Sequence, residues 1–386
     1  MKILIATEIY KPAINGVVTS TLTLKAALEK LGHDVRILTL GEHNSEDPVQ
    51  HVYRVRSFSI GKLYPGARFS LTRDAYPIQE LIDWHPDVIH TQGEFSTFRM
   101  AQKIAKALQI PLVHTYHTVY EDYTHYFSPS KRLGKKVVEK LSKSLLEKTV
   151  RIIAPTVKVK KMLERYGVDE PVSVIPTGLP LAKFKRQVPT ADKQQLKQQL
   201  GLSADDFVLV SLGRLGKEKN IQEIIHFLKK LALPQVHLVI VGDGPYREAL
   251  EALVQELDLE AVVHFVGMVC PEQVPLYYQI GDLFVSGSTS ETQGLTYIEA
   301  FASGLPALCR ADDSLTGVIE HGVTGFQYHN FNEFQNYLTD YLEDEALRTQ
   351  VAQAAQQLAI EKFSAEAFAE CVLNVYQAAI NAYASE

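Results

Sequence analysis

Two glutamates separated by seven residues mark the part of the chain where a reaction is easiest to place. They are Glu291 and Glu299, in the stretch STSETQGLTYIEAFASGLP of residues 288–306. A carboxylate accepts hydrogen bonds from two neighbouring hydroxyl groups, which ribose and hexoses both carry. The pair also fits an ordinary helix entry, in which Glu291 is an N-terminal acid and Glu299 a solvated side chain. The surrounding residues have to distinguish these interpretations.

The residues between the two glutamates predict an anion-binding helix entry. A predicted strand at 282–288 leads through a short loop into a predicted helix that ends at 304. Gly294 lets a ligand approach the backbone, and Leu295 and Thr296 then present free N–H groups at the start of the helix. These groups, together with the glutamates, are suited to a diphosphate that joins two sugars.

Two cations lie where an earlier strand, predicted at 206–215, ends in the loop GRLGKEKN. Arg214 offers a fork of donors and Lys219 a point charge, a combination that suits a diphosphate. The alternative is a pair of surface cations near a helix start. Cations are disfavoured at a helix N-terminus unless an anion joins them, so we favour the binding site.

The first predicted strand of the chain leads into the loop TEIYKPAINGVVTST. We expect backbone N–H groups at Gly16 and Val17 to approach the same anion. The loop lacks the G-x-G-x-x-G pattern of dinucleotide-binding domains, which lowers the odds of a nicotinamide enzyme.

Histidines and tyrosines gather after two other predicted strands, in HTQGEFS (90–96) and VHTYHTVYEDYTHYF (113–127). No H-E-x-x-H or similar metal-ligand spacing appears, and the tyrosines favour a sugar or an amphiphile over a metal. We single out His117 as an active-site candidate. Glu94, Tyr116 and Tyr120 are candidates for contacts with an acceptor.

Strand and helix alternate along the chain, and the strands are apolar throughout, which is typical of parallel sheets covered on both faces. A segment rich in Pro, Gly and charge at 175–193 interrupts the alternation, which then restarts. We therefore predict two doubly wound α/β domains with a cleft between them, and ligands at the carboxyl ends of the strands.

Composition narrows the class of protein. The formal net charge of −6 over 386 residues argues against a general nucleic-acid binder. The 3 scattered cysteines predict neither a disulfide framework nor a zinc site, and fit a reduced cytoplasmic setting. The N-terminus lacks a signal-peptide pattern, and no window approaches the roughly 18 apolar residues of a membrane-spanning helix.

Several motifs together resemble the retaining glycosyltransferases of family 4, which have the GT-B fold. They are the loop around Gly16, GRLGKEKN, VGDGP, FVGMV, and the E-x7-E motif with EAFASGLP. The resemblance covers nearly the whole chain. It implies an acceptor- and membrane-facing domain at 1–180 plus about 365–386, and a nucleotide-sugar domain at 181–364. The final helix, roughly 365–384, is then expected to cross back onto the first domain.

The resemblance also implies roles for single residues. The cations matching Arg214 and Lys219 bind the diphosphate and stabilise the departing nucleotide, while Glu291 contacts the donor sugar. His117 matches the active-site histidine near the transferred sugar. The remaining donor contacts are expected at Glu299, for the ribose, and at backbone of Gly16, Val17, Met268, Gly294, Leu295 and Thr296. Enzymes of this kind need no metal, and no cofactor beyond the donor substrate is expected.

Within the family, TYHTVYEDYTHY and TQGEFS look like the bacterial diacylglycerol glucosyltransferases. A basic amphipathic segment at 131–148 agrees, since such a helix on an acidic protein is typical of a membrane surface element. The residues of this segment that we expect to contact the membrane are Lys131, Arg132, Lys135, Lys136 and Lys140. The alternative is a solvated helix packed on its own domain.

Three functions remain open at this point. The first is transfer of a hexose, most simply glucose, from a UDP-sugar to diacylglycerol or a glycosyl-diacylglycerol at the inner face of the cell membrane. The second is a family 4 transferase with a polysaccharide or small soluble acceptor. The third is a nucleotide-sugar isomerase or non-catalytic binder on the same fold. The sequence does not distinguish the donor sugar or the oligomeric state.

Overall fold

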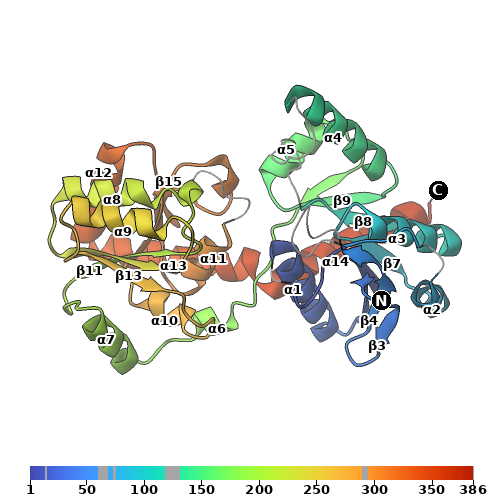
Figure 1. The fold of residues 1–386 in the computed structure, drawn as a ribbon, viewed down its shortest axis with the longest axis horizontal. Coiled ribbons are helices and arrows are strands. Elements are labelled where there is room, and N and C mark those ends of the chain that lie inside the picture. The colour runs from blue at the N-terminus through green and yellow to red at the C-terminus, as the bar shows by residue number, and fades with distance from the viewer. Residues whose placement is uncertain (14, 60–67, 73–74, 118–130, 289–293, 386) are drawn as a thin grey trace. The chain divides into compact units, whose positions relative to one another are not determined.

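The computed structural model describes residues 1–386 except 14, 60–67, 73–74, 118–130, 289–293 and 386. The chain forms two compact units, Met1–Gly178 with Ala365–Glu386, and Leu179–Ser364 (Figure 1). Each unit holds a sheet between layers of helices, largely parallel in unit 1 and wholly parallel in unit 2. The alternation of apolar strands with helices in the sequence predicts this arrangement.

The sheet of unit 1 has the strand order β10-β9-β8-β7-β1-β2-β4-β3. All neighbouring pairs are parallel except β3 with β4. Its strands are β1 Lys2–Ala6, β2 Asp34–Gly41, β3 Ser45–Asp47, β4 Val52–Arg56, β7 Val88–Thr91, β8 Leu112–Thr115, β9 Arg151–Ala154 and β10 Val172–Val174. A separate antiparallel pair joins β5 Phe58–Ser59 to β6 Arg68–Phe69.

Alternate residues of β1 face two separate cores. Ile3 and Ile5 pack in the core that also holds side chains of α1 and α14, whereas Leu4 packs in the core that also holds side chains of α2 and α3. Both faces of the strand are therefore buried, which explains its unbroken apolar sequence. The helices of unit 1 are α1 Gly16–Lys30, α2 Tyr76–Trp84, α3 Ser96–Leu108, α4 Lys131–Leu146, α5 Val157–Arg165 and α14 Ala365–Tyr383.

The final helix, α14, belongs to unit 1 although it follows unit 2 in the chain. Phe368, Val372 and Tyr376 are buried in the same core as Leu24 and Leu28 of α1. The prediction that the last helix returns to the first domain is confirmed.

Unit 2 has the parallel strand order β13-β12-β11-β14-β15-β16. Figure 1 shows α8, α9 and α12 on one side of this sheet and α10 and α13 on the other. The strands are β11 Phe207–Leu212, β12 Val236–Val241, β13 Val263–Gly267, β14 Leu283–Ser286, β15 Ala307–Arg310 and β16 Gly325–Tyr328. The helices are α6 Ala182–Lys185, α7 Thr190–Gln199, α8 Ile221–Leu231, α9 Arg247–Glu256, α10 Val274–Gln279, α11 Leu295–Ala302, α12 Phe331–Glu343 and α13 Glu345–Phe363, with short 3-10 turns η2 Lys217–Lys219 and η3 Asp313–Leu315.

The differences from the sequence prediction lie mainly at strand ends. The strand predicted at 206–215 stops at Leu212, so the cation-bearing residues belong wholly to a loop and to η2. Strands β3 to β6 and helix α2 did not follow from the alternation, because short edge elements carry too few residues for a clear period. Among the described residues, no helix combines the length and apolarity needed to cross a bilayer.

Candidate functional site

The polar residues singled out from the sequence fall at the carboxyl ends of strands in both units. In unit 2 these ends are those of β11, β12, β13 and β14, and in unit 1 those of β1, β7 and β8. Each unit therefore gathers these residues along one edge of its sheet, formed by the carboxyl ends of the strands, which is where open α/β sheets bind ligands.

Glycines let the loops of unit 2 pack backbone against backbone. A Cβ atom on Gly242 would lie 2.0 Å from the carbonyl oxygen of Gly213, and one on Gly244 would lie 2.5 Å from that of Leu215. Gly213 and Gly242 also have φ angles of 146° and 126°, which disfavour any residue with a side chain. The motif VGDGP thus packs against the loop that carries Arg214 and Lys219 and shapes it.

Arg214 and Lys219 both lie on this loop. The Arg214 side chain is 62% exposed and forms an ion pair with Glu218, and Lys219 closes η2. Glu218 was not singled out from the sequence, although its place four residues after Arg214 was a visible signal. It orients the guanidinium in the absence of an anion, and an exposed pair of this kind contributes little to stability.

Asn220 connects the cation loop to the neighbouring strand end. It has a left-handed backbone, with φ of 51°, and its amide donates to Glu223 at 2.9 Å and to the carbonyl of Gly287 at 3.2 Å. Gly287 permits this approach, since a Cβ there would lie 2.4 Å from the carbonyl oxygen of Asn220. The loops after β11 and β14 are therefore fixed to each other.

The helix entry predicted from the sequence is present at α11. Gly294 has φ of 68°, and a Cβ there would meet the ring of Tyr297 at 2.7 Å. Leu295 and Thr296 are half-buried and form the first turn, whose N–H groups have no acceptor within the helix. Glu291 lies outside the described residues.

Glu299 is held in place rather than solvated. The hydroxyl of Tyr278 donates to its Oε2 at 3.0 Å. Burial raises the pKa of Glu299, and the hydrogen bond from Tyr278 acts in the opposite direction. Tyr278 is fully buried, and sequence reasoning missed it because it lies on α10, outside the motif. The alternative that Glu299 is a plain surface acid is wrong. Met268 follows β13 with its side chain 77% exposed.

In unit 1 the first turn of α1 has backbone N–H groups that find no acceptor within the helix. The side chain of Asn15 caps the helix by accepting from the N–H of Val18 at 2.9 Å. Gly16 is exposed, Val17 is half-buried, and a Cβ on Gly16 would meet nothing within 4 Å. Packing against the described residues of unit 1 therefore does not explain why residue 16 is a glycine.

Glu8, directly after β1, caps helix α3 from a distance. Its Oε1 accepts from the N–H groups of Phe95 and Thr97, at 3.1 and 2.8 Å, and from the hydroxyl of Thr97 at 2.9 Å. Gly93 makes room for it, since a Cβ there would lie 2.7 Å from Cγ of Glu8. Burial raises the pKa of Glu8 to about 7. Sequence reasoning missed Glu8, whose only signal was an acid at the first strand end.

His117 lies in a cluster of polar side chains. Its Nε2 is 2.6 Å from Oε1 of Gln92. Burial, and then the neighbouring His114, lower the pKa of His117 to about 3, so the ring is neutral. The Nδ1 of His114 bonds the hydroxyl of Thr91 at 2.8 Å, and its Nε2 is 3.5 Å from Glu94. Glu94 therefore belongs to this cluster.

Tyr116 packs beneath α4. It is fully buried, and its hydroxyl shares a hydrogen bond of 2.9 Å with Ser142 of that helix. This contact holds α4 and leaves the tyrosine no exposed surface for an acceptor. Tyr120, and the side chains of Lys131 and Arg132, lie outside the described residues.

Helix α4 has one buried and one exposed side. Val138 and Leu146 are buried in the core, whereas Val137 and Leu141 are 45% and 65% exposed. The exposed residues of this helix also include Lys135, Lys136 and Lys140. The helix therefore packs on its own domain and also presents apolar and basic side chains to the outside, and its role at a membrane surface stays a prediction.

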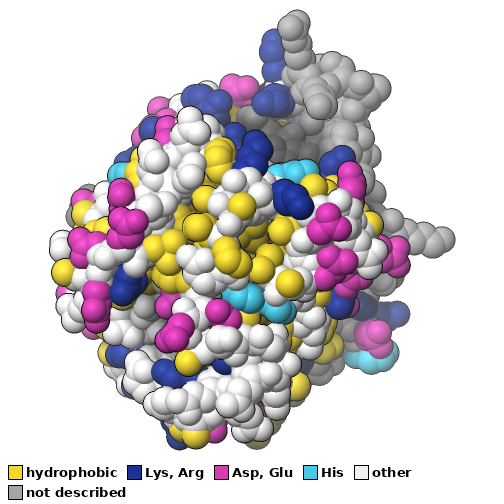
Figure 2. Space-filling view, turned by 90° about the vertical axis from the view of Figure 1, so that its left-hand side faces the viewer, with side chains coloured by type: hydrophobic (Ala, Val, Ile, Leu, Met, Phe, Trp, Pro, Cys, Tyr) yellow, Lys and Arg dark blue, Asp and Glu magenta, His cyan; other side chains and the backbone are white. Residues whose placement is uncertain are grey.

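Figure 2 shows a surface of unit 2, on the side where Figure 1 labels α8, α9 and α12. It differs in composition from the exposed side of α4. Hydrophobic side chains gather at its centre, with acidic and basic side chains around them. This mixture of charges contrasts with the lysine-rich outer side of α4.

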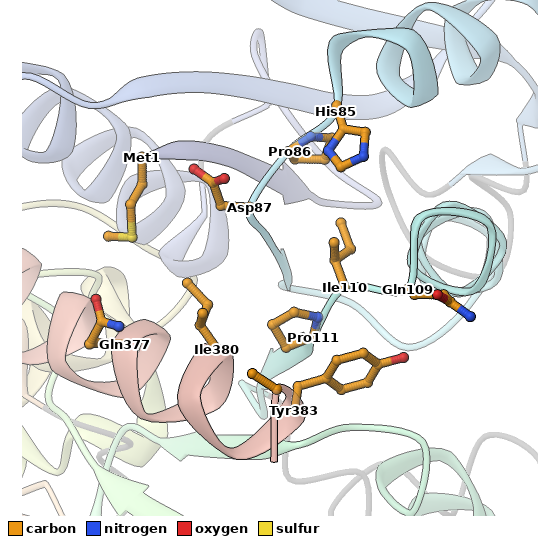
Figure 3. A pocket seen from close by; sticks show the side chains of 11 residues that line it. Met1, His85, Pro86, Asp87, Gln109, Ile110, Pro111, Gln377, Ile380 and Tyr383 are labelled. Atoms are coloured by element: carbon orange, nitrogen blue, oxygen red, sulfur yellow. The ribbon is translucent and has the colours of Figure 1, made fainter. Parts of the chain in front are cut away.

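A cavity of about 750 Å³ opens at the other end of the unit 1 strands (Figure 3). Met1, Asp87 and Pro111, which directly precede β1, β7 and β8, line it together with Ile380 and Tyr383 of α14. It therefore lies away from the polar cluster. Within the described part of the chain, no three His, Cys, Asp or Glu residues are placed to hold a metal ion.

Two family models match the chain. Residues 14–183 match Glycosyltransferase Family 4, and residues 192–358 match Glycosyl transferases group 1. An alpha-monoglucosyldiacylglycerol synthase of Streptococcus pneumoniae is 35% identical over 89% of this chain and 78% of that protein. Another, of Acholeplasma laidlawii, is 32% identical over 97% of this chain and 96% of that protein.

Solved structures support the same fold. The Anabaena protein Alr3699/HepE, crystallised in complex with UDP, has a TM-score of 0.72 at 21% identity, and the match covers 98% of this chain and 100% of that one. Sucrose-phosphate synthase from Thermosynechococcus elongatus has a TM-score of 0.69 at 22% identity, over the full length of both chains. At these identities the similarity establishes the GT-B fold and no more.

Proposed function

The chain belongs to glycosyltransferase family 4 and is a hexosyltransferase, and from this premise we propose that it transfers glucose from UDP-glucose to diacylglycerol or a glycosyl-diacylglycerol, forming an α-linked membrane glycolipid. The observation that carries the proposal is the similarity, over 97% of the chain, to an enzyme named for the synthesis of monoglucosyldiacylglycerol.

The charges of unit 2 suit the donor. When the bond between the sugar and the diphosphate breaks, negative charge develops on the leaving phosphate. Arg214 and Lys219 would stabilise this charge, together with the N–H groups of Leu295 and Thr296. The exposed guanidinium of Arg214 would then exchange its partner Glu218 for the diphosphate.

Each of the two glutamates would bind a different sugar of the donor. Glu299, held by Tyr278, would accept from the ribose hydroxyls, and Glu291 from hydroxyls of the transferred hexose. Backbone near Met268 would meet the base. Gly16 and Val17 would contribute backbone donors from unit 1.

Retention of the anomeric configuration is proposed to follow from attack on the same face as the leaving group. The bond from C1 to the UDP oxygen breaks and a bond from C1 to the acceptor oxygen forms. The acceptor's proton passes to the leaving phosphate, so no carboxylate nucleophile is needed. His117, neutral at physiological pH, would hydrogen-bond the transferred sugar without adding a positive charge beside it.

Helix α4 supports a lipid acceptor at a membrane surface. Val137 and Leu141 would enter the interface, while Lys136 and Lys140 would lie at the headgroups of an anionic leaflet. Each lysine near such a leaflet contributes about 1 kcal/mol, enough for reversible attachment to the inner face of the cell membrane.

The test is an incubation of the purified chain with UDP-glucose and vesicles that contain diacylglycerol. We expect a glucosyl-lipid whose anomeric proton has the small coupling of an α-glycoside. Parallel incubations with UDP-galactose and UDP-GlcNAc test the donor, and monoglucosyl-diacylglycerol and a soluble oligosaccharide test the acceptor. Transfer to the oligosaccharide alone, or a changed donor without transfer, would refute the proposal in favour of a soluble-acceptor transferase or an isomerase.

A further inference from the structure

Gln92 lies between the buried His90 and the half-buried His117 in unit 1. It follows β7, and its side chain is buried. Its amide oxygen is 2.6 Å from Nε2 of His117, and its amide nitrogen is 3.1 Å from Nε2 of His90. One amide therefore contacts both rings, one with its acceptor and the other with its donor.

The amide decides where each ring carries its hydrogen. An amide nitrogen only donates, so Nε2 of His90 must accept, and the hydroxyl of Thr115, 2.7 Å from the same nitrogen, donates to it as well. An amide oxygen only accepts, so Nε2 of His117 must carry a hydrogen. The neutral His117 ring then has its lone pair on Nδ1.

The same set of hydrogen bonds reaches the last helix of the chain. His90, with a bare Nε2, carries its hydrogen on Nδ1, which is 2.7 Å from the hydroxyl of Tyr376 on α14. Burial, and then His114 and His117, lower the pKa of His90 well below its usual range, so this ring is neutral too. Tyr376 is fully buried, and its ring also meets His90 edge to face.

We propose that Gln92 is a positioning residue that holds His117 as the Nε2–H tautomer and, through His90, ties this choice to Tyr376 on α14. The consequence is a hydrogen-bond acceptor at Nδ1 of His117, suited to a hydroxyl group of the transferred sugar rather than to a phosphate oxygen. The inference rests on the proposed function only in placing His117 beside that sugar.

The first experiment measures the tautomer directly and needs no substrate. The full-length protein is labelled with ¹⁵N in its histidine rings, and long-range ¹H–¹⁵N correlations are recorded between pH 5.5 and 8. The His117 signals are assigned by their loss in His117→Asn. We expect a protonated Nε2 and a bare Nδ1 across this range. A protonated Nδ1, which requires the opposite orientation of the Gln92 amide, would overturn the inference.

Two substitutions of Gln92 separate positioning from simple packing. Gln92→Met keeps the size but removes both hydrogen bonds, so we expect mixed tautomers at His117 and a fall in kcat/KM for UDP-glucose of about tenfold. Gln92→Glu keeps an acceptor beside Nε2 and adds a negative charge that favours the imidazolium. We therefore expect it to raise the pKa of His117 and to add a matching step to the pH–rate profile.

Gln79→Met is the matched control, because Gln79 is exposed on α2 and its side chain bonds only Asp83 among the described residues. It should change neither the His117 signals nor kcat/KM. If both Gln92 variants fold and keep the tautomer and the rate of the wild type, the inference is wrong. If the wild type transfers no hexose to lipid but shows the Nε2–H tautomer, the proposed function fails and the assignment to Gln92 stands.

Discussion

The edges formed by the carboxyl ends of the strands are built from different kinds of groups in the two units. In unit 1 the edge consists of buried and half-buried side chains that bond one another, with Gln92, His90 and His117 as the central group. In unit 2 it consists of glycine-rich backbone that carries exposed charge, as at Gly242 and Arg214. The side chains of unit 1 thus fix one another's orientation, whereas the exposed Arg214 of unit 2 is free of such packing and can exchange its partner.

The largest effect should come from the exposed charge of unit 2. Lys219→Ala removes a cation from the developing phosphate charge, and we expect kcat/KM for UDP-glucose to fall by about 10²–10³, with little change in stability. Lys217→Ala, in the same turn and exposed, is the control and should stay within about threefold of the wild type. Equal effects of the two substitutions would show that the loop provides only general positive charge.

The backbone of unit 2 is tested by Gly242→Ala. The new Cβ would collide with the carbonyl of Gly213, so the free energy of unfolding in urea should fall by about 3 kcal/mol. Gly201→Ala, which has a positive φ but no atom within 4 Å of a new Cβ, should cost only about 1 kcal/mol. Similar losses at the two sites would mean that the close approach of the loops does not matter.

Glu8, the buried acid of unit 1, should make the stability of the protein depend on pH. Burial raises the pKa of Glu8 from 4.5 to about 7 in the folded state. The folded state then binds more protons than the unfolded state in this range, so Glu8 makes the protein less stable as the pH rises from 4.5 to 7.

Glu8→Gln should remove this contribution. The difference in unfolding free energy between the variant and the wild type should shift in favour of the variant by about 2 kcal/mol across the range. Glu80→Gln, an exposed acid on α2, serves as the control. A difference that stays constant with pH would show that Glu8 has the same pKa in the folded and unfolded states.

The smallest effect is expected outside both edges, on α4. Lys140→Gln should weaken binding to vesicles rich in phosphatidylglycerol by about 1 kcal/mol, or roughly fivefold, measured by co-sedimentation at low salt. Lys106→Gln, exposed at the end of α3, should leave binding unchanged. If the wild type does not bind such vesicles, the membrane role of α4 is excluded.

The candidate residues of unit 2 were easier to predict from the sequence than those of unit 1. Arg214, Lys219 and Gly294 belong to short motifs in which glycine, charge and a strand end lie within a few residues. Their chemistry is local, so spacing alone pointed to an anion. Glu299 was placed correctly on its helix, but its partner Tyr278 comes from a separate helix and left no trace in the motif.

Local order along the chain was enough for the alternation of strands and helices, the two α/β domains and the glycine-led start of α11, because the apolar period, glycines and helix caps depend on near neighbours in the sequence. The protonation states of unit 1 depend instead on contacts that only folding creates. Glu8 meets Thr97 across 89 positions, and His90 meets Tyr376 across 286. Burial and the orientation of a single amide are properties of those contacts, and for that reason the tertiary structure alone assigns a neutral ring to His117.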